Sequence, residues 1–337
     1  MKRHAIPALV VGSLSLLGMP ASAQVELRYS SWDPPSHEMR ANGVHIWAQQ
    51  VEKVTNGRVK VRILPKPVGA PPAHHDLLID GAIDAANIIP GYTPGRFLFH
   101  KLMEFPFVSD DPEARAVAFW RVHSKFFDKA NELAGLKLLG VWCTDGGAIH
   151  NQKRPVTSAA DLSGLKMRVA NDTIGKLANS LGASPLFAPI TQVHDLLSKG
   201  VADGIFVGPE AIKNFKLNKV LKYTTIVPGG MFTTGFYLTV SKKAWDRIQP
   251  ADQKAIVDIS GEKVSQMVGK AWKTANQRGL ELMKASGFEI RTADAKLIDS
   301  INKAWAPLEA EWVADAKKKG VDGVAAIAAY KAELAKF

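Results

Sequence analysis

The sequence predicts an α/β protein of two small lobes, each built on a sheet of mostly parallel strands, with the two sheets facing one another. Strand-like and helix-like segments alternate in the same order in two parts of the chain, and the two parts also share letters. The composition, with 46% hydrophobic and 22% charged residues, is that of a globular protein. A chain of 337 residues is long enough for two domains.

The first 23 residues are typical of a cleavable secretory signal peptide. Lys2 and Arg3 precede an apolar run over residues 5–17, and the small residues Ala21-Ser22-Ala23 follow. This run is too short to span a bilayer, and no later stretch is long and apolar enough to do so. We therefore expect an exported protein whose mature chain begins at Gln24 and does not insert into a membrane.

The first lobe is predicted from residues 24–146. Apolar residues alternate at Val25, Leu27 and Tyr29, which indicates a half-buried strand that ends near Trp32. The segments that follow predict a helix, a strand, a short helix and a strand, over residues 44–54, 59–63, 77–80 and 85–89.

The second lobe is predicted from residues 147–234, where the same order recurs. Its strands are expected over residues 165–169, 184–187 and 204–207, and its helices over residues 173–181 and 191–199. Leu77-Leu78, Gly81 and Asp84 recur at one constant spacing as Leu196-Leu197, Gly200 and Asp203. Matching letters in matching elements indicate two related lobes.

The remaining segments are expected to connect and brace the lobes. Residues 235–260 return to the first lobe and residues 286–305 to the second. A long helix over residues 251–286 spans both, and C-terminal helices fill residues 306–337.

Arg168 is the leading candidate for a ligand-binding residue. It lies near the end of a predicted strand, and Asn171, Asp172 and Thr173 can each cap the helix that follows. Ligands of open α/β sheets bind beyond the carboxyl ends of the strands. The rigid guanidinium fork suits a carboxylate, although an arginine at a strand end can also reach an acidic partner on the surface.

Other side chains are predicted at strand ends around the same cleft. For each of them a role in the core or on the surface is the alternative. These residues are Trp32, Tyr92, Phe187, Phe206, Val207 and Glu210.

No catalytic or metal-binding constellation is evident. His74-His75-Asp76 is the most metal-like cluster, but adjacent residues on a helix point in different directions. The sequence has no H-E-x-x-H motif, phosphate-binding loop or nucleophile elbow. We therefore predict a protein without catalytic activity, metal or cofactor, with an exported metalloenzyme built on this cluster as the alternative.

The charge distribution argues against a nucleic-acid partner. The formal net charge is +11, but the lysines are scattered, and no basic run is interleaved with aromatic residues. Such an excess on the surface gives a mild bias toward anionic ligands.

Several passages, in this order and spacing, resemble one family. They are Gly91–Gly95, Glu104–Phe107, Lys153-Arg154-Pro155, Asp161–Val169, Leu181–Pro185 and Gly200–Gly204. Over essentially its whole mature length, the chain resembles the solute receptors of tripartite ATP-independent periplasmic (TRAP) transporters, the DctP-like family.

This resemblance implies a periplasmic-binding-protein-like fold, with two α/β lobes joined by hinge strands and braced by a long helix. It implies closure of the lobes around a small organic acid in the periplasm and delivery of that ligand to the TRAP permease subunits in the membrane. It also implies that Arg168 is the carboxylate anchor. A periplasmic receptor that passes its ligand to a sensor kinase is the alternative, and a neighbouring permease gene would discriminate between the two.

The chain departs from the family pattern at two places. Many members have an asparagine where this chain has Ile205-Phe206-Val207, and some receptors for sugar acids carry a second arginine where Gly147 and Ala148 stand. Both departures remove polar contacts. We therefore expect an apolar or aromatic monocarboxylate rather than a sugar acid or a dicarboxylate.

Overall fold

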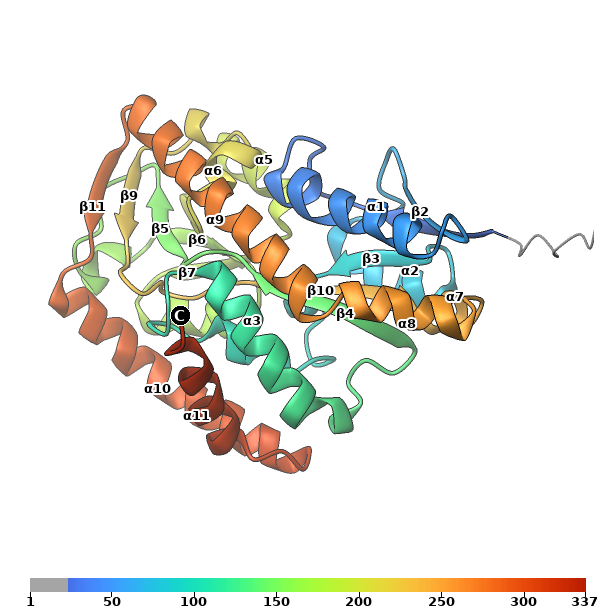
Figure 1. Ribbon diagram of the computed structural model, residues 1–337. Coiled ribbons are helices and arrows are strands. Elements are labelled where there is room, and N and C mark those ends of the chain that lie inside the picture. Colours follow the sequence, from blue (N-terminus) through green and yellow to red (C-terminus); the bar gives the residue numbers. More distant parts are fainter. Residues whose placement is uncertain (1–23) are drawn as a thin grey trace, which may run out of the picture.

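The computed structural model describes residues 24–337, so the predicted signal peptide over residues 1–23 lies outside the described residues. Two sheets lie side by side, with helices around them, as Figure 1 shows. We call the part built on the first sheet the first lobe and the part built on the second sheet the second lobe. The predicted two-lobe α/β architecture is confirmed.

The first sheet has the strand order β2-β1-β3-β10-β4. Its strands are β1 (Val25–Ser30), β2 (Val59–Ile63), β3 (Ala85–Ile88), β4 (Leu136–Cys143) and β10 (Gly235–Ser241). Strand β1 runs parallel to β2 and β3, whereas β10 is antiparallel to β3 and β4.

The second sheet has the strand order β11-β9-β5-β8-β6-β7. Its strands are β5 (Ala148–Asn151), β6 (Lys166–Val169), β7 (Ser184–Phe187), β8 (Gly204–Val207), β9 (Tyr223–Ile226) and β11 (Glu289–Thr292). Strand β5 is antiparallel to both β8 and β9. Each sheet is thus mixed rather than parallel, because β5 and β10 each enter from the other lobe and run against their neighbours.

Helices surround the two sheets, and none in residues 24–337 has both the length and the apolar character needed to cross a membrane. They are α1 (His45–Val54), α2 (His74–Asp80), α3 (Pro112–Val122), α4 (Asp172–Ser180), α5 (Val193–Ser198), α6 (Glu210–Asn214), α7 (Lys242–Trp245), α8 (Pro250–Ile259), α9 (Glu262–Ala285), α10 (Ala295–Lys318) and α11 (Gly323–Leu334). The C-terminal helices therefore begin at Ala295, earlier than residue 306.

The single long helix predicted over residues 251–286 is wrong, because the chain forms two helices there. Gly261 separates α8 from α9 with φ of 65°, a conformation that favours glycine, and its N–H donates to Leu139 O. A Cβ at this position would lie 2.7 Å from the Trp120 ring. Helix α9 alone packs against β4 in the first lobe and α6 in the second, and Figure 1 shows it crossing both.

The letter repeat corresponds to a structural repeat. Helix α2 leads to β3, and α5 leads to β8. Each helix is followed by a glycine with positive φ, 80° at Gly81 and 67° at Gly200. The expectation of equivalent elements at the two places is confirmed, and it puts the ends of β3 and β8 at corresponding places in the two lobes.

Two segments cross between the lobes side by side. One joins β4 to β5 over residues 144–147, and the other joins β9 to β10 over residues 227–234. The N–H of Thr144 donates to Thr234 O at 3.0 Å, and the N–H of Gly147 donates to Phe232 O at 2.7 Å. A Cβ on Gly147 would lie 2.4 Å from the Phe232 ring, so this position has no room for a larger side chain.

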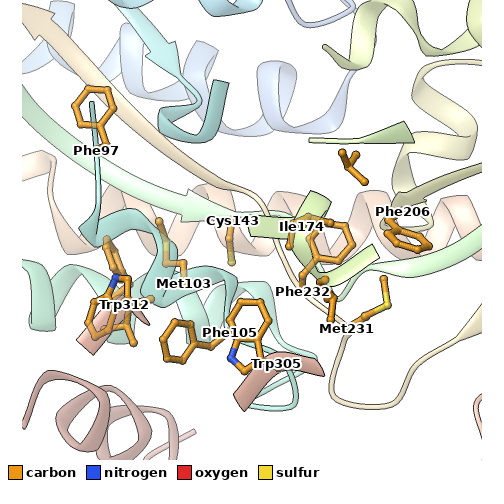
Figure 2. Packing of buried hydrophobic residues seen from close by; sticks show 14 of the residues in the cluster. Phe97, Met103, Phe105, Cys143, Ile174, Phe206, Met231, Phe232, Trp305 and Trp312 are labelled. Carbon is orange, nitrogen blue, oxygen red and sulfur yellow. The ribbon is translucent and has the colours of Figure 1, made fainter. Parts of the chain in front are cut away.

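Arg115 on α3 holds several loops together beneath the crossing segments. The side chain is fully buried, and its Nε donates to Ser109 O at 2.7 Å. One Nη donates to Met103 O and Phe105 O, at 2.7 and 3.0 Å, and the other to Gly229 O at 3.3 Å. The loops that it joins carry the aromatic core seen in Figure 2, where Phe105 lies beside Trp305.

Candidate functional site

Arg168 lies on β6, and its side chain is buried with 2% of its surface exposed. Its Nε donates to Ala188 O at 2.8 Å and one Nη to the Tyr92 hydroxyl at 3.1 Å. Burial lowers the pKa of the Arg168 guanidinium. No carboxylate of residues 24–337 lies within salt-bridge distance of it. A buried, unpaired cation of this kind is poised for an anion.

Tyr92 reaches Arg168 from the opposite lobe. It follows β3 in the first lobe, and its hydroxyl accepts hydrogen bonds from Arg168 and from the N–H of Ile190, the latter at 3.0 Å. Both donors belong to the second lobe. Because the hydroxyl oxygen accepts both bonds, its own hydrogen stays available to donate to an anion beside Arg168.

A small cavity of about 30 Å³ lies between the lobes at this point. This volume is far below the range for small-molecule sites, ~300–1,000 Å³, so the lobes must move apart to admit a ligand. The lining residues are Trp32, Asp33, His37, Ile89, Tyr92, Thr144, Arg168, Ala170, Ile190, Val207, Glu210, Phe215, Thr234, Phe236 and Trp272.

Aromatic side chains form much of the wall of this cavity. Trp32 stacks on Phe236 with ring centroids 6.2 Å apart, and Phe236 packs against Trp272 at 5.5 Å. The three residues come from the first lobe, the crossing strand β10 and helix α9. A wall of this kind suits a flat apolar group.

The structure brings most of the predicted site residues together. Trp32, Tyr92, Arg168, Val207 and Glu210 all line the cavity.

Phe187 and Phe206 do not line it. Phe206 is fully buried and, as Figure 2 shows, lies beside Met231 and Phe232 in the hydrophobic core. Side chains alternate along a strand, so Val207 faces the cavity when Phe206 faces away. Phe187 lies on β7, at the edge of the second sheet, with 46% of its surface exposed.

Sequence reasoning missed a polar cluster in the same cavity. Asp33 and His37 follow β1, and the His37 Nε2 lies 3.4 Å from the Glu210 carboxylate across the cleft. Burial opposes protonation of His37, but the hydrogen bond to Glu210 and the nearby carboxylates raise its pKa. Asp33 and His37 lie in the loop beside Trp32. Their position just after a strand could have identified them as candidate site residues. Phe236 and Trp272 carried no such signal.

Further polar contacts hold the lobes against each other. Glu38 of the first lobe receives hydrogen bonds from Lys213 on α6 and Arg278 on α9. Burial opposes ionisation of Glu38, but these two cations lower its pKa to about 2. The ion pairs of Glu38, like the contacts of Tyr92 and His37, join one lobe to the other. The lobes therefore meet around the cavity.

Glu104 makes a buried contact across the same cleft. It ends the 3₁₀ helix Phe99–Glu104 in the first lobe and accepts hydrogen bonds from the Asn171 side chain at 3.0 and 3.1 Å. Asn171 also caps α4 through Ile174 N–H, as predicted. Burial raises the pKa of Glu104 to about 8, although the charge of Lys101 opposes this.

The Glu104 carboxyl should therefore make stability depend on pH. Its pKa is about 8 in the folded chain and about 4.5 for a solvated glutamate, so the folded state holds the proton more tightly. The contribution of Glu104 to the free energy of unfolding is fully present below its pKa in the unfolded chain. It is lost as pH rises through its pKa in the folded chain. We expect the melting temperature of a Glu104→Gln variant to fall less between pH 5 and 8 than that of the unchanged protein.

The matched comparison is needed because other buried groups titrate in the opposite sense. Burial lowers the pKa of His150 to about 4, which favours the folded state as pH rises. This term is present in both proteins and cancels in their difference. Parallel melting curves for both proteins across this pH range would contradict the assignment.

The histidine cluster does not assemble a metal site. His74 is buried and its Nε2 lies 2.9 Å from the Ser30 hydroxyl, whereas the partly buried His75 side chain contacts Asp76 and Arg96. Within residues 24–337, no group of three or more histidine, cysteine or acidic side chains is placed to hold a metal ion. Cys143 is buried, which raises its pKa to about 12 and makes a thiolate nucleophile unfavourable.

Comparisons with known proteins agree with this geometry. Residues 31–315 match the family model described as bacterial extracellular solute-binding protein, family 7, or DctP. A relative from Comamonas testosteroni, described as the outer membrane transporter protein TsaT, is 28% identical over 326 residues, or 95% of this chain and 96% of that protein.

Two solved structures are also similar. A TRAP periplasmic solute-binding protein from Bordetella bronchiseptica with bound (R)- and (S)-mandelate is 35% identical with a TM-score of 0.90, over 93% of this chain and 99% of that one. A TRAP solute-binding protein from Rhodoferax ferrireducens in complex with copurified benzoate is 28% identical with a TM-score of 0.86, over 93% and 98%.

Proposed function

Because this chain belongs to family 7 of the bacterial extracellular solute-binding proteins, the receptors of TRAP transporters, we propose that it captures an aromatic or otherwise apolar monocarboxylate. Members of this family serve transport and are not enzymes. In this proposal Arg168 binds the ligand carboxylate, and Trp32, Tyr92 and Val207 enclose the rest of the molecule.

The observation that carries the proposal is the unpaired, buried guanidinium of Arg168. Its remaining N–H groups have no protein acceptor among the described residues. A ligand carboxylate would supply that acceptor and compensate the charge. The aromatic wall of Trp32, Phe236 and Trp272 favours a ring over a polyhydroxyl chain. The relatives with bound mandelate and benzoate support the same ligand class.

Transport follows from closure and release in the periplasm. Export by the predicted signal peptide would place the receptor there, as in the relative from Bordetella bronchiseptica. Tyr92, His37 and Glu38 join the two lobes over the cavity, so ligand release requires these contacts to break. We propose that the TRAP permease subunits receive the ligand at this step.

A thermal-shift screen tests the ligand class. We expect benzoate, phenylacetate or mandelate to raise the melting temperature of the purified protein, and succinate and glucuronate to leave it unchanged. A ligand at 100 times its dissociation constant stabilises a folded protein by ~2.7 kcal/mol, which for a chain of this size corresponds to several degrees. A response to sialic or uronic acids alone would refute the proposal.

A further inference from the structure

We infer that the ligand carries a hydroxyl group in addition to its carboxylate, and that Glu210 accepts a hydrogen bond from this hydroxyl. His37 positions Glu210 for that contact. The inference rests on the proposed function, because it concerns the same cavity and a ligand whose carboxylate is held by Arg168.

Two carboxylates in the cavity have an oxygen without a protein donor. Oε2 of Glu210 receives the Asn214 amide at 3.1 Å and lies 3.4 Å from the His37 Nε2, whereas no side chain or backbone group of residues 24–337 bonds to Oε1. Oδ2 of Asp33 accepts hydrogen bonds from the Ser31 hydroxyl and the Asn87 amide. Within residues 24–337, no group donates to its Oδ1.

These carboxylates are almost completely shielded from solvent. Glu210 is 2% exposed and Asp33 is 4% exposed, and both line the cavity. An acceptor buried without a donor costs free energy. A ligand that brings a donor removes this cost.

The same cavity also contains donors that lack acceptors. Trp32 and Trp272 line it, and the indole Nε1 of each is buried with no hydrogen-bond partner in the described chain. A hydroxyl group both donates and accepts, so one such group can satisfy a carboxylate oxygen and an indole N–H. An ammonium group has no lone pair to offer and can satisfy the carboxylates only.

The hydrogen bonds of His37 fix its orientation in the cavity. The His37 Nδ1 accepts the N–H of Met39 at 3.1 Å, which leaves Nε2 with a hydrogen that faces Glu210. His37 is thus a neutral imidazole whose Nε2–H donates to Glu210 and orients its carboxylate.

Calorimetric titration with matched acids tests the inference. The pairs are benzoate with its 2-, 3- and 4-hydroxy derivatives, and phenylacetate with mandelate. We expect at least one hydroxylated acid to bind at least about tenfold more tightly than its parent. Sites built around a ligand hydroxyl can reject the analogue that lacks it by about 10⁴-fold. Equal affinities in every pair would overturn the inference, and so would tightest binding by the ammonium analogue phenylglycine.

Variants then assign the contact. The Glu210→Gln variant should bring the ratio of the affinities for the hydroxylated acid and its parent close to one. His37→Gln should reduce this ratio in part. Glu311→Gln is the matched control, because Glu311 is an exposed partner of Lys176 far from the cavity. An unchanged preference in Glu210→Gln would overturn the assignment. If that variant does not fold, Glu210→Asp, which shortens the reach of the carboxylate, must show the reduced preference instead.

The two proposals fail in different ways. If no aromatic acid binds, the proposed function is wrong and the hydroxyl inference falls with it. If benzoate and phenylacetate bind as tightly as all their hydroxylated partners, the proposed function stands and only the further inference is refuted.

Discussion

Replacing Arg168 by alanine should weaken ligand binding by about 30-fold to several thousandfold. The variant leaves the ligand carboxylate buried without its partner, a loss that typically costs ~2–5 kcal/mol. The Arg168 side chain is only 2% exposed, so solvent screens its interaction with the ligand carboxylate only weakly. The affinity of Arg168→Lys should lie between those of the unchanged protein and Arg168→Ala, because lysine keeps the charge and loses the planar guanidinium fork.

Isothermal titration with an acid identified in the thermal-shift screen measures this effect. Lys166→Ala is the matched control, because Lys166 lies on the same strand with an exposed side chain. The melting temperatures without ligand show whether both variants fold. An Arg168→Ala protein that binds nearly as tightly as the unchanged protein would rule out Arg168 as the carboxylate anchor.

Replacing Arg115 by alanine should lower the free energy of unfolding by about 3–5 kcal/mol, the largest loss expected of the variants described. Arg115 is fully buried and donates to four backbone carbonyls, those of Met103, Phe105, Ser109 and Gly229. Truncation removes all these donors at once and leaves a cavity in their place. An unsatisfied buried acceptor costs about 1–3 kcal/mol, less where water can enter.

Arg121 provides a control on the same helix. It pairs with Glu262 and Glu333, but its side chain is 37% exposed, and exposed pairs contribute about 0–1 kcal/mol each. Urea unfolding should therefore separate the two alanine variants clearly. Similar unfolding free energies for Arg115→Ala and Arg121→Ala would contradict the role of Arg115.

The sequence was informative where local chemistry decides the structure. Strand β6, the cap at Asn171 and the helix that follows are all set by neighbouring residues, and they place Arg168 at the cleft. The glycines Gly81 and Gly200 end equivalent helices for the same local reason. Features of this kind can be predicted because the residues that cause them lie within a few positions of one another.

Other features depend on contacts between distant parts of the chain. The turn at Gly261 follows from packing against Trp120 and Leu139, so helical periodicity across residues 251–286 gave no warning of it. The choice between Phe206 and Val207 as the cavity residue depends on strand register, and a shift by one residue reverses it. His37 and Glu210 meet only because the two lobes close.

The position of Tyr92 separates how the ligand is caught from how long it stays. Its partners Arg168 and Ile190 both belong to the other lobe, so its hydroxyl joins the site only when the lobes meet. Arg168 belongs to the second lobe alone and can engage a carboxylate while the cleft is open. If Arg168 anchors the carboxylate as proposed, we expect the association rate to depend on the second lobe and the residence time on Tyr92 of the first.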